Sequence, residues 1–581
     1  MPLSLKQGYC ILKNIGSVED QINDWLRQTE IDPEHFTMGI AILLVAIFIF
    51  SIACFFYVVK SYRILVFIFC LLVPFSFLIF PILAFFKWSG NRKKKTKKKK
   101  FRKVIYPEWT FSLPLVNQAN VYIPNPFRGI FIAGGAGAGK SRSVIEPLIY
   151  QSVEKGYTGL LYDYENPVLA RHVWTAFRSF PSLVKDYYVN FTDLERSHRL
   201  NPLAATFMIS SSYAREYSNT ILANLMPETI SKPKDFWIRN SESLFAAIMW
   251  YLRERHPQYC SLPHAVSLAL TDDLNKLIEV ISQEEECAGM VASIKGGLKS
   301  DNQTAGILAT IQNALAGINT PEIFWVLYGD DLTLDLNNPQ APKFLTVGND
   351  PGLVDTYSPV ISLILSAALK MMNKQDQQRS VFIVDELPTL YVPNLDRIPA
   401  TARKNQIATI LSVQDYSQLE DKYSPKKAEV ITSVLSNQFF GNTKNPHTAE
   451  RISRLYGKYD QEFVTTSQGR SSGHSTGGAS IFGTNSRGRN YSRSTTIQER
   501  SRVKPQDISN LNKGEFYGSV VEAEQTEFKV QFAGFEHTTL EIPRLQTVSS
   551  EQVKENYKQI KAEAKTILQG SAPSYEARVE W

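Results

Sequence analysis

The sequence predicts an α/β protein: a mainly parallel β-sheet with helices on both faces, an all-α insertion within that fold, and a two-helix transmembrane hairpin ahead of it. Three observations lead to this fold class. Two uncharged apolar runs stand near the N-terminus, a glycine-rich phosphate-binding motif follows them, and a later apolar strand ends in two carboxylates. With 581 residues, of which 44% are hydrophobic and 20% charged, the chain is long enough for several folded units and falls outside the disordered class.

The two apolar runs span residues 37–59 and 64–86, and neither contains a charged residue. Each is long enough to cross a hydrocarbon core as a helix, and the short link between them permits only a tight antiparallel hairpin. A helical hairpin buried in a soluble core is the alternative, but soluble helices carry a polar face that these runs lack. We therefore predict two transmembrane helices, preceded by a separate N-terminal segment at residues 1–36.

A local cluster of basic residues sets the predicted orientation of these helices. The chain holds 63 Lys and Arg against 56 Asp and Glu, a formal net charge of +7. Residues 87–103 contain eleven basic residues and no acidic one, so the rest of the chain is slightly acidic. By the positive-inside rule this juxtamembrane segment is cytoplasmic, together with both termini and everything that follows. We interpret the cluster as a topology anchor touching anionic lipid rather than as a DNA contact.

Residues 134–141 form a complete G-x-x-x-x-G-K-[ST] motif. The motif follows a short apolar run, Ile130–Ala133, and precedes a helix-like stretch that ends before Gly156. Backbone N–H groups of such a loop curl around phosphate oxygens, while Lys140 would reach the terminal phosphates and the Ser141 hydroxyl would ligate Mg²⁺. The predicted nucleotide-binding residues are Gly134, Gly135, Ala136, Gly137, Ala138, Gly139, Lys140 and Ser141.

A second motif supports the same chemistry. The apolar strand run that starts at Ser380 ends in Asp385 and Glu386. At the end of such a strand an aspartate holds the Mg²⁺ shell, and the next glutamate can polarise the attacking water. An acidic surface turn is the alternative interpretation, but two motifs in the right order on strand-like runs predict a P-loop NTPase that binds ATP and Mg²⁺.

The remaining pattern predicts the domain organisation. Strand-length apolar runs recur at 157–163, 186–191, 343–348 and 406–413, as expected for a parallel sheet buried on both faces. Residues 204–325 instead show helix-period apolar runs. We therefore predict a nucleotide-binding domain in two parts, 104–203 and 326–545, an all-α insertion at 204–325 between them, and a C-terminal helix and tail at 546–581 that begins with a capping box at Ser549 and Gln552.

Several stretches of this sequence match a known family: NPFRG at 125–129, RLNPL at 199–203, DFW at 235–237 and the helix-like run at 304–316. The chain resembles the type IV coupling proteins, the TraG/TraD-like membrane ATPases of conjugative DNA transfer, and NPFRG with GAGKS resembles the type found in mobile elements of Bacteroidota. The resemblance implies a RecA-like nucleotide-binding domain, an inner-membrane location and a homo-hexamer around a channel. It also implies three partners: a relaxase–DNA complex, single-stranded DNA and the inner-membrane components of a type IV secretion system.

The resemblance also implies roles for three residues outside the two motifs. Gln414 stands where the family has a γ-phosphate-sensing glutamine, and Arg403 where it has an arginine finger supplied to a neighbouring subunit. Arg128 matches another nucleotide-site arginine. A turn glutamine and an ordinary surface arginine are the alternatives for the first two. The turn at 163–166 departs from the family pattern, so its role stays open.

Residues 463–498 contain no acidic residue and are rich in Ser, Gly and Thr, which predicts a flexible loop. This loop is either a mobile basic element that grips DNA phosphates without reading sequence or a plain surface loop. The candidate DNA contacts are Arg470, Arg487, Arg489 and Arg493.

Three functions fit these features. The first is a membrane-anchored, DNA-stimulated ATPase that passes relaxase-bound DNA into a type IV secretion channel. The second is an FtsK-like translocase of double-stranded DNA, although no extended linker or separate C-terminal domain follows the motor motifs. The third is an ATP-gated receptor platform for secreted protein substrates, in which hydrolysis is dispensable.

Overall fold

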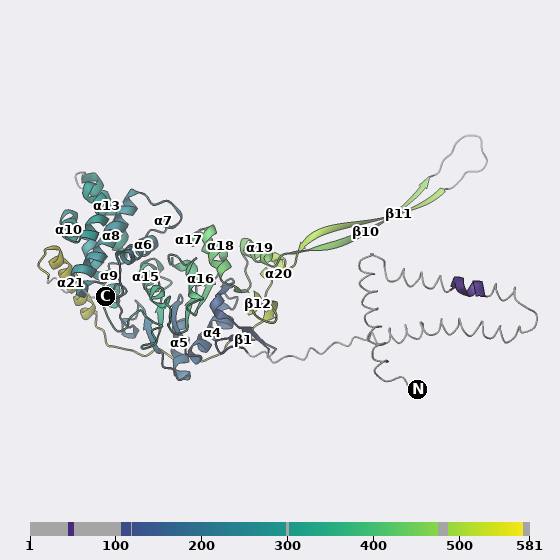
Figure 1. Ribbon diagram of the computed structural model, residues 1–581, viewed down its shortest axis with the longest axis horizontal. Coiled ribbons are helices and arrows are strands. Elements are labelled where there is room, and N and C mark those ends of the chain that lie inside the picture. The colour runs from purple at the N-terminus through teal and green to yellow at the C-terminus, as the bar shows by residue number, and fades with distance from the viewer. Residues whose placement is uncertain (1–44, 52–105, 118, 298–300, 474–485, 573–581) are drawn as a thin grey trace, which may run out of the picture. The chain divides into compact units, whose positions relative to one another are not determined.

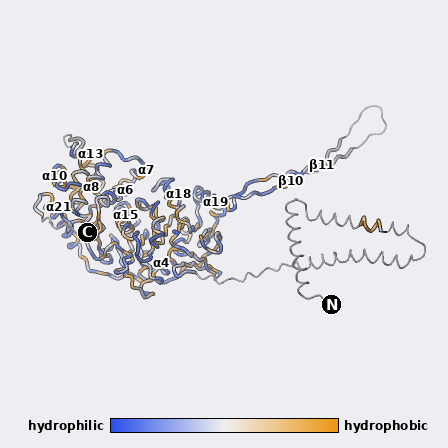
Figure 2. The backbone as a smooth tube through the Cα atoms, viewed as in Figure 1, coloured by the Kyte–Doolittle hydropathy of each residue, from blue (hydrophilic) through white to orange (hydrophobic). Residues whose placement is uncertain are grey.

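The computed structural model describes residues 45–51, 106–117, 119–297, 301–473 and 486–572 (Figure 1). The chain divides into two units, Met1–Ile105 and Tyr106–Trp581. Residues 45–51 of the first unit are helical and apolar (Figure 2). The rest of the predicted membrane segment, and the predicted segments at 1–36 and 87–103, lie outside the described residues. Within the described ranges, no helix has the length and apolar character needed to cross a membrane.

A nine-stranded sheet forms the centre of the second unit. Its strands are β3 (Ile130–Ala133), β4 (Thr158–Asp163), β5 (Lys185–Val189), β6 (Lys343–Gly348), β7 (Ser380–Val384), β8 (Ile407–Val413), β9 (Asn437–Phe440), β12 (Glu515–Ser519) and β13 (Glu527–Gln531). The strands from β9 through β3, β8, β7, β4 and β6 to β5 run parallel, while β12 and β13 extend the β9 edge in antiparallel pairing. A separate hairpin joins β1 (Phe111–Pro114) to β2 (Asn120–Ile123).

The strand runs predicted from the sequence are confirmed as β3 to β8, with ends that shift by two residues or fewer. Every residue of β3, β4, β6, β7 and β8 is buried. Such strands are mainly apolar because helices cover both of their faces, and this is why the continuous apolar runs predicted them well.

Two hydrophobic clusters cover the two faces of the sheet. Along β3 successive residues alternate between them: Ile130 and Ile132 pack in one cluster, Phe131 and Ala133 in the other. The first cluster includes residues of α4 (Glu146–Glu154) and α5 (Val168–Ser179), and the second includes residues of α6 (Ser211–Leu225) and α15 (Val354–Met372). The sheet is therefore the middle layer of three.

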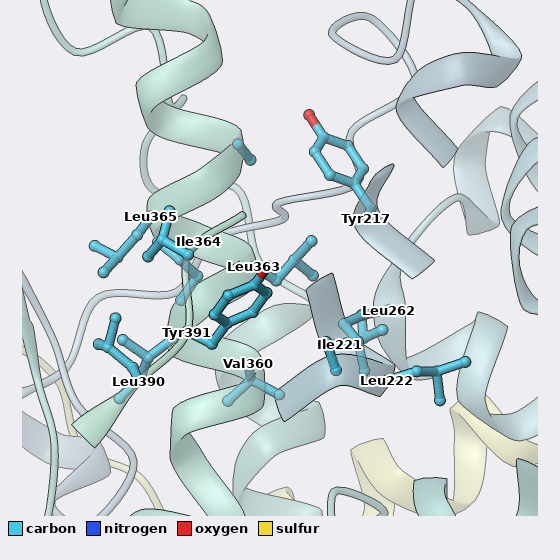
Figure 3. Packing of buried hydrophobic residues seen from close by; sticks show 14 of the residues in the cluster. Tyr217, Ile221, Leu222, Leu262, Val360, Leu363, Ile364, Leu365, Leu390 and Tyr391 are labelled. Carbon is cyan, nitrogen blue, oxygen red and sulfur yellow. The ribbon is translucent and has the colours of Figure 1, made fainter. Parts of the chain in front are cut away.

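The all-α part shares its core with the sheet. Figure 3 shows Tyr217 and Ile221 of α6 close to Val360 and Leu363 of α15, within one hydrophobic cluster that continues into the helices beyond. The helix-period runs predicted around 241–253 and 304–316 are confirmed as parts of α8 and α13. The helices after α6 are α7 (Glu228–Ser231), α8 (Phe236–Arg255), α9 (Leu262–Ala269), α10 (Leu274–Ile281), α11 (Glu285–Met290), α12 (Ala292–Gly297), α13 (Asp301–Ala316) and α14 (Pro321–Leu327).

The segment predicted as a flexible loop at 463–498 is largely a β-ribbon, which corrects that prediction. Strands β10 (Lys458–Gly473) and β11 (Ser486–Ser501) pair antiparallel between α19 (Pro446–Leu455) and α20 (Pro505–Ser509) (Figure 1). Absence of core-forming residues does not exclude this structure, because each strand satisfies the other's backbone N–H and C=O groups. The ribbon is mainly hydrophilic (Figure 2).

The C-terminal part of the chain returns across the molecule. After β13 an extended segment at 533–549 leads to α21 (Ser550–Leu568). The predicted capping box is confirmed: the Ser549 side chain accepts from the Gln552 N–H, and the Gln552 side chain accepts from the Ser549 N–H. The helix is not fully solvated, since Ile560 and Ile567 are buried and α21 packs against α9 and α14 of the all-α part.

Gly159 in the middle of β4 provides a test of this packing. A Cβ added there would lie 2.3 Å from the Phe344 ring, which is fully buried in β6. We expect Gly159→Ala to lower the free energy of unfolding by about 1–3 kcal/mol, because an overpacked core cannot move the ring aside. Urea unfolding would measure this, with Gly289→Ala as control, since a Cβ at Gly289 meets nothing within 4 Å. Equal stability of the Gly159→Ala variant and the wild type would contradict the packing described.

Candidate nucleotide site

The predicted site residues converge at the carboxyl ends of four neighbouring strands. The phosphate-binding loop follows β3, Gln414 follows β8, Asp385 and Glu386 follow β7, and the turn at 163–166 follows β4. In open α/β sheets ligands bind at this edge. The strand ends enclose a polar cavity of about 250 Å³. Its lining residues are Gly135, Ala136, Gly137, Ala138, Gly139, Lys140, Ser141, Arg142, Glu146, Tyr164, Glu165, Asp385, Glu386, Gln414 and Lys513.

The phosphate-binding loop is held between two other backbone segments. Gly137 and Gly139 have φ angles of +74° and +98°, a conformation that L side chains rarely adopt. The Gly135 N–H donates to the carbonyl of Asn442 just beyond β9 (2.6 Å), and the Gly514 N–H donates to the carbonyl of Ala138 (2.9 Å). Residues remote in sequence thus fix the loop on both sides.

Lys140 is almost buried, with 8% of its surface exposed. Its Nζ donates to the carbonyl oxygen of Gly134, the first residue of the motif, at 2.7 Å. Burial lowers the pKa of Lys140, and the nearby carboxylates of Glu386 and Asp385 oppose that shift. The ammonium group is therefore held at the loop, close to the carboxyl groups that follow β7.

Of the two carboxylates after β7, Glu386 is buried and Asp385 is half-buried, and both lie close to this lysine. Burial raises the pKa of Asp385 to about 6, against the opposing effects of Lys140 and of a hydrogen bond with Ser141. Burial also raises the pKa of Glu386 to about 7, although its Oε1 accepts the Gln414 N–H at 3.1 Å. Glu386 is thus a buried group whose proton equilibrium lies near neutral pH, as a general base requires.

The oxygen groups present fit a bound Mg²⁺. The Ser141 hydroxyl is hydrogen-bonded to Asp385, so two hard oxygen ligands already stand together at the start of the motif helix. The exposed Glu165 lies close enough to raise the pKa of Asp385 further. A divalent cation would offset this concentration of negative charge.

Glu146 and His172 behind the loop form a neutral pair. The Glu146 Oε2 lies 3.6 Å from the His172 Nε2, but burial raises the pKa of Glu146 to about 7 and lowers that of His172 to about 4. Between these values both side chains are uncharged, so the contact is not a salt bridge at moderately acidic pH. Glu146 lies five residues beyond Ser141, on the first turn of α4, and contributes to the cavity wall.

Five of the cavity residues were not predicted from the sequence. Arg142 and Glu146 follow the phosphate-binding motif, and Tyr164 and Glu165 follow a predicted strand, so closeness to a motif or to a strand end was the available signal. Lys513 comes from the loop between α20 and β12. Nothing in the sequence near Lys513 marks it, because the P-loop contact that brings it here involves the backbone of Gly514.

The structure does not bring the predicted arginines to this cavity. Arg128 lies before β3, at the opposite edge of the sheet, and its Nε is 2.5 Å from the Glu522 carboxylate. Arg403 is exposed at the end of α16 (Ile398–Ala402), before β8. The predicted DNA contacts lie in the ribbon: Arg470 in β10, and Arg487, Arg489 and Arg493 in β11.

Comparison with known protein families matches residues 123–530 to the type IV secretion-system coupling protein DNA-binding domain. The chain belongs to the type IV coupling proteins. The matched range begins at the end of β2 and runs to β13, so it includes the nucleotide site, the all-α part and the ribbon. The resemblance noted from the sequence motifs is thereby confirmed.

Individual coupling proteins are similar to this chain at 24% identity or less. The coupling protein TraD of Escherichia coli (strain K12) is 24% identical over 355 residues, which is 58% of this chain but 44% of TraD. The unbound bacterial conjugative coupling protein TrwBdeltaN70 superposes with a TM-score of 0.54 at 16% identity, covering 74% of this chain and 89% of that one. TrwB in complex with ADP and Mg²⁺ superposes with a TM-score of 0.53 at 16% identity, covering 72% of this chain and 87% of that one. TrwB in complex with the ATP analogue ADPNP superposes with a TM-score of 0.54 at 16% identity, covering 73% of this chain and 89% of that one.

Asp163 at the end of β4 gives this coupling protein a testable pH dependence. It is fully buried, its Oδ2 accepts the Ala170 N–H at 2.9 Å, and burial raises its pKa from 3.8 to about 8. Between pH 4 and 8 the unfolded chain therefore releases this proton while the folded chain keeps it, so stability falls as the pH rises.

We expect Asp163→Asn to remove this loss, so that the variant gains stability relative to wild type between pH 5 and pH 8. Urea unfolding without nucleotide at both pH values would measure the difference. Asp421→Asn at an exposed position of α17 (Tyr416–Tyr423) is the matched control. An unchanged pH dependence in Asp163→Asn would show that Asp163 does not titrate as described.

Proposed function

We propose that this chain is an inner-membrane-anchored ATPase that couples a relaxase–DNA complex to a type IV secretion channel and drives conjugative transfer of DNA. The observation that carries the proposal is the grouping of Lys140, Ser141, Asp385, Glu386 and Gln414 around one cavity in a coupling-protein fold. TrwB binds ADP with Mg²⁺ and an ATP analogue, which supports the same ligands here.

In this proposal each cavity residue has a distinct task. The loop N–H groups and Lys140 bind the phosphates, and Glu386 accepts a proton from the attacking water. Gln414 senses the γ-phosphate, and its backbone N–H orients Glu386. Ser141 and Asp385 would hold Mg²⁺, which neutralises charge on the phosphate oxygens when bound.

We further propose the assembly and location that the family implies. Subunits form a homo-hexamer around a channel, with Arg403 reaching the nucleotide of the neighbouring subunit; the exposure of Arg403 is compatible with this role. The uncharged runs at 37–59 and 64–86 and the basic segment at 87–103 support a two-pass anchor with a cytoplasmic ATPase. Partners are the relaxase–DNA complex, single-stranded DNA and inner-membrane secretion components.

Substitution of Glu386 or Lys140 distinguishes an ATP-driven motor from a receptor platform in which hydrolysis is dispensable. We expect Glu386→Gln to lower ATP turnover by about 100-fold or more, the usual contribution of a general base, and Lys140→Ala to abolish it. The assay uses the full chain in detergent, with and without single-stranded DNA, and Glu279→Gln on the exposed side of α10 as the matched control. A mating assay on the same alleles measures transfer.

Hydrolysis and transfer should fail together in both variants. Retention of transfer by Glu386→Gln would favour the receptor platform. Failure of the wild type to hydrolyse ATP under any condition that assembles it would rule out the motor. Stimulation of hydrolysis by double-stranded DNA alone would favour the FtsK-like alternative.

The position of Arg403 can be tested by mixing inactive subunits. We expect Arg403→Ala and Lys140→Ala each to be inactive alone, because each lacks one half of every site. A random mixture should regain about a quarter of wild-type ATPase activity, since an intact Lys140 then meets an intact Arg403 across some head-to-tail interfaces. The control is a mixture of Glu386→Gln with Lys140→Ala, which both affect the same cavity and should remain inactive. No recovery in the first mixture would contradict a role in the neighbouring site.

A further inference from the structure

The pairing of β10 with β11 assigns the ribbon residues to two faces. Residues directly opposite each other in an antiparallel pair share a face, and neighbours along a strand alternate. Arg470 pairs with Arg489, and the pairs on either side on the same face are Ser472 with Arg487 and Gln468 with Tyr491. The next pair on that face joins Thr466 to Arg493. All four arginines of the segment therefore belong to one face.

The other face of the same stretch is uncharged. Its pairs are Thr465 with Ser494, Ser467 with Ser492, Gly469 with Asn490 and Ser471 with Gly488. A random placement of arginines would divide them between the faces. The register instead produces a basic face and a small, polar face on one two-stranded element.

Charge also differs along the length of the ribbon. Acidic and basic residues are mixed at the end next to α19 and α20, where Asp460, Glu462 and Glu499 stand beside Lys458 and Arg500 and Glu499 forms an ion pair with Lys458. The four arginines lie in the outer part, over about 20 Å from Arg487 to Arg493 at ~3.4 Å per residue. Among the outer residues whose side chains are described, Tyr491 is 65% exposed and Arg493 is exposed too.

We propose that this face, made by Arg470, Arg487, Arg489, Tyr491 and Arg493, is a DNA-binding site that contacts the phosphate backbone. It deepens the proposed coupling function and rests on it. A stripe of about 20 Å matches roughly six phosphates of one strand at ~3.4 Å each along a duplex. A two-stranded ribbon also fits the width of a DNA major groove, and an exposed tyrosine can stack on an unpaired base.

Charge and polarity favour DNA over a lipid surface as the occupant. Membrane-bound elements bury an apolar face next to their basic residues, whereas Thr, Gln and Ser accompany the arginines here.

Two ribbon variants of the full chain in detergent test this site. The first replaces all four arginines by serine. The second keeps composition and net charge but divides the arginines between the faces: Arg489→Asn with Asn490→Arg, and Arg493→Ser with Ser492→Arg. Affinity for a short labelled single strand and for the duplex of the same sequence is measured across salt concentrations. Basal ATPase without DNA should stay at the wild-type level in both variants, because the ribbon contributes nothing to the cavity.

We expect the four-serine variant to bind DNA about tenfold or more weakly at moderate salt. The slope of log affinity against log salt should fall by about 3.6 on the duplex and about 2.8 on the single strand if all four arginines contact phosphates. The divided-face variant should also bind more weakly than wild type despite its equal charge. The DNA form that shows the larger loss identifies the preferred ligand.

Four outcomes would overturn the site. If the four-serine variant binds DNA with wild-type affinity, the ribbon is not a DNA-binding site, but the proposed coupling function is unaffected. Wild-type affinity in the divided-face variant shows diffuse charge rather than one binding face. Unchanged DNA binding with lost binding to phosphatidylglycerol vesicles identifies a membrane contact instead. If the wild type binds no DNA at all, the coupling function fails together with the site.

Discussion

Burial of the parallel strands on both faces is the constraint on which the rest of this structure depends. Residues of β3, β4, β7 and β8 meet apolar side chains above and below the sheet, and an unpaired charge within such strands would cost several kcal/mol. Charged groups can therefore stand only at or beyond the strand ends. Since these four strands are neighbours and parallel, their carboxyl ends bring Lys140, Asp385, Glu386 and Gln414 together. The site is a consequence of how the sheet is covered.

The same constraint explains which parts of the structure could be predicted from the sequence. Strands buried on two faces produce continuous apolar runs, so β3 and β6 were predicted to the residue. Strands β12 and β13 alternate buried with more exposed residues and contain charged residues, and β9 begins with the polar residues Asn437 and Gln438. The ribbon was missed for another reason: its order comes from backbone pairing between strands, which composition does not reveal.

Within the candidate site, the sequence indicated the residues that lie in local motifs and not those that arrive from a distance. The P-loop and the Asp385–Glu386 pair each follow one strand, so their spacing carries the signal. Lys513 enters through contacts of the Gly514 and Ala138 backbones, and hydrogen bonds of this kind can be made by any residue type. The placement of Arg128 beside Glu522 depends on a partner 394 residues away, which no local pattern encodes.

Strand β8 has a mechanical consequence for communication along the sheet. The exposed Arg403 precedes it at one edge, and at the other edge the Gln414 N–H holds the Glu386 carboxylate. Residues 404–406 and then the seven buried residues of β8 lie between these points, and β8, which is ~23 Å long, pairs with β3 on one side and β7 on the other. The backbone therefore connects the exposed Arg403 directly to the N–H that holds the Glu386 carboxylate, through a strand that is hydrogen-bonded on both sides.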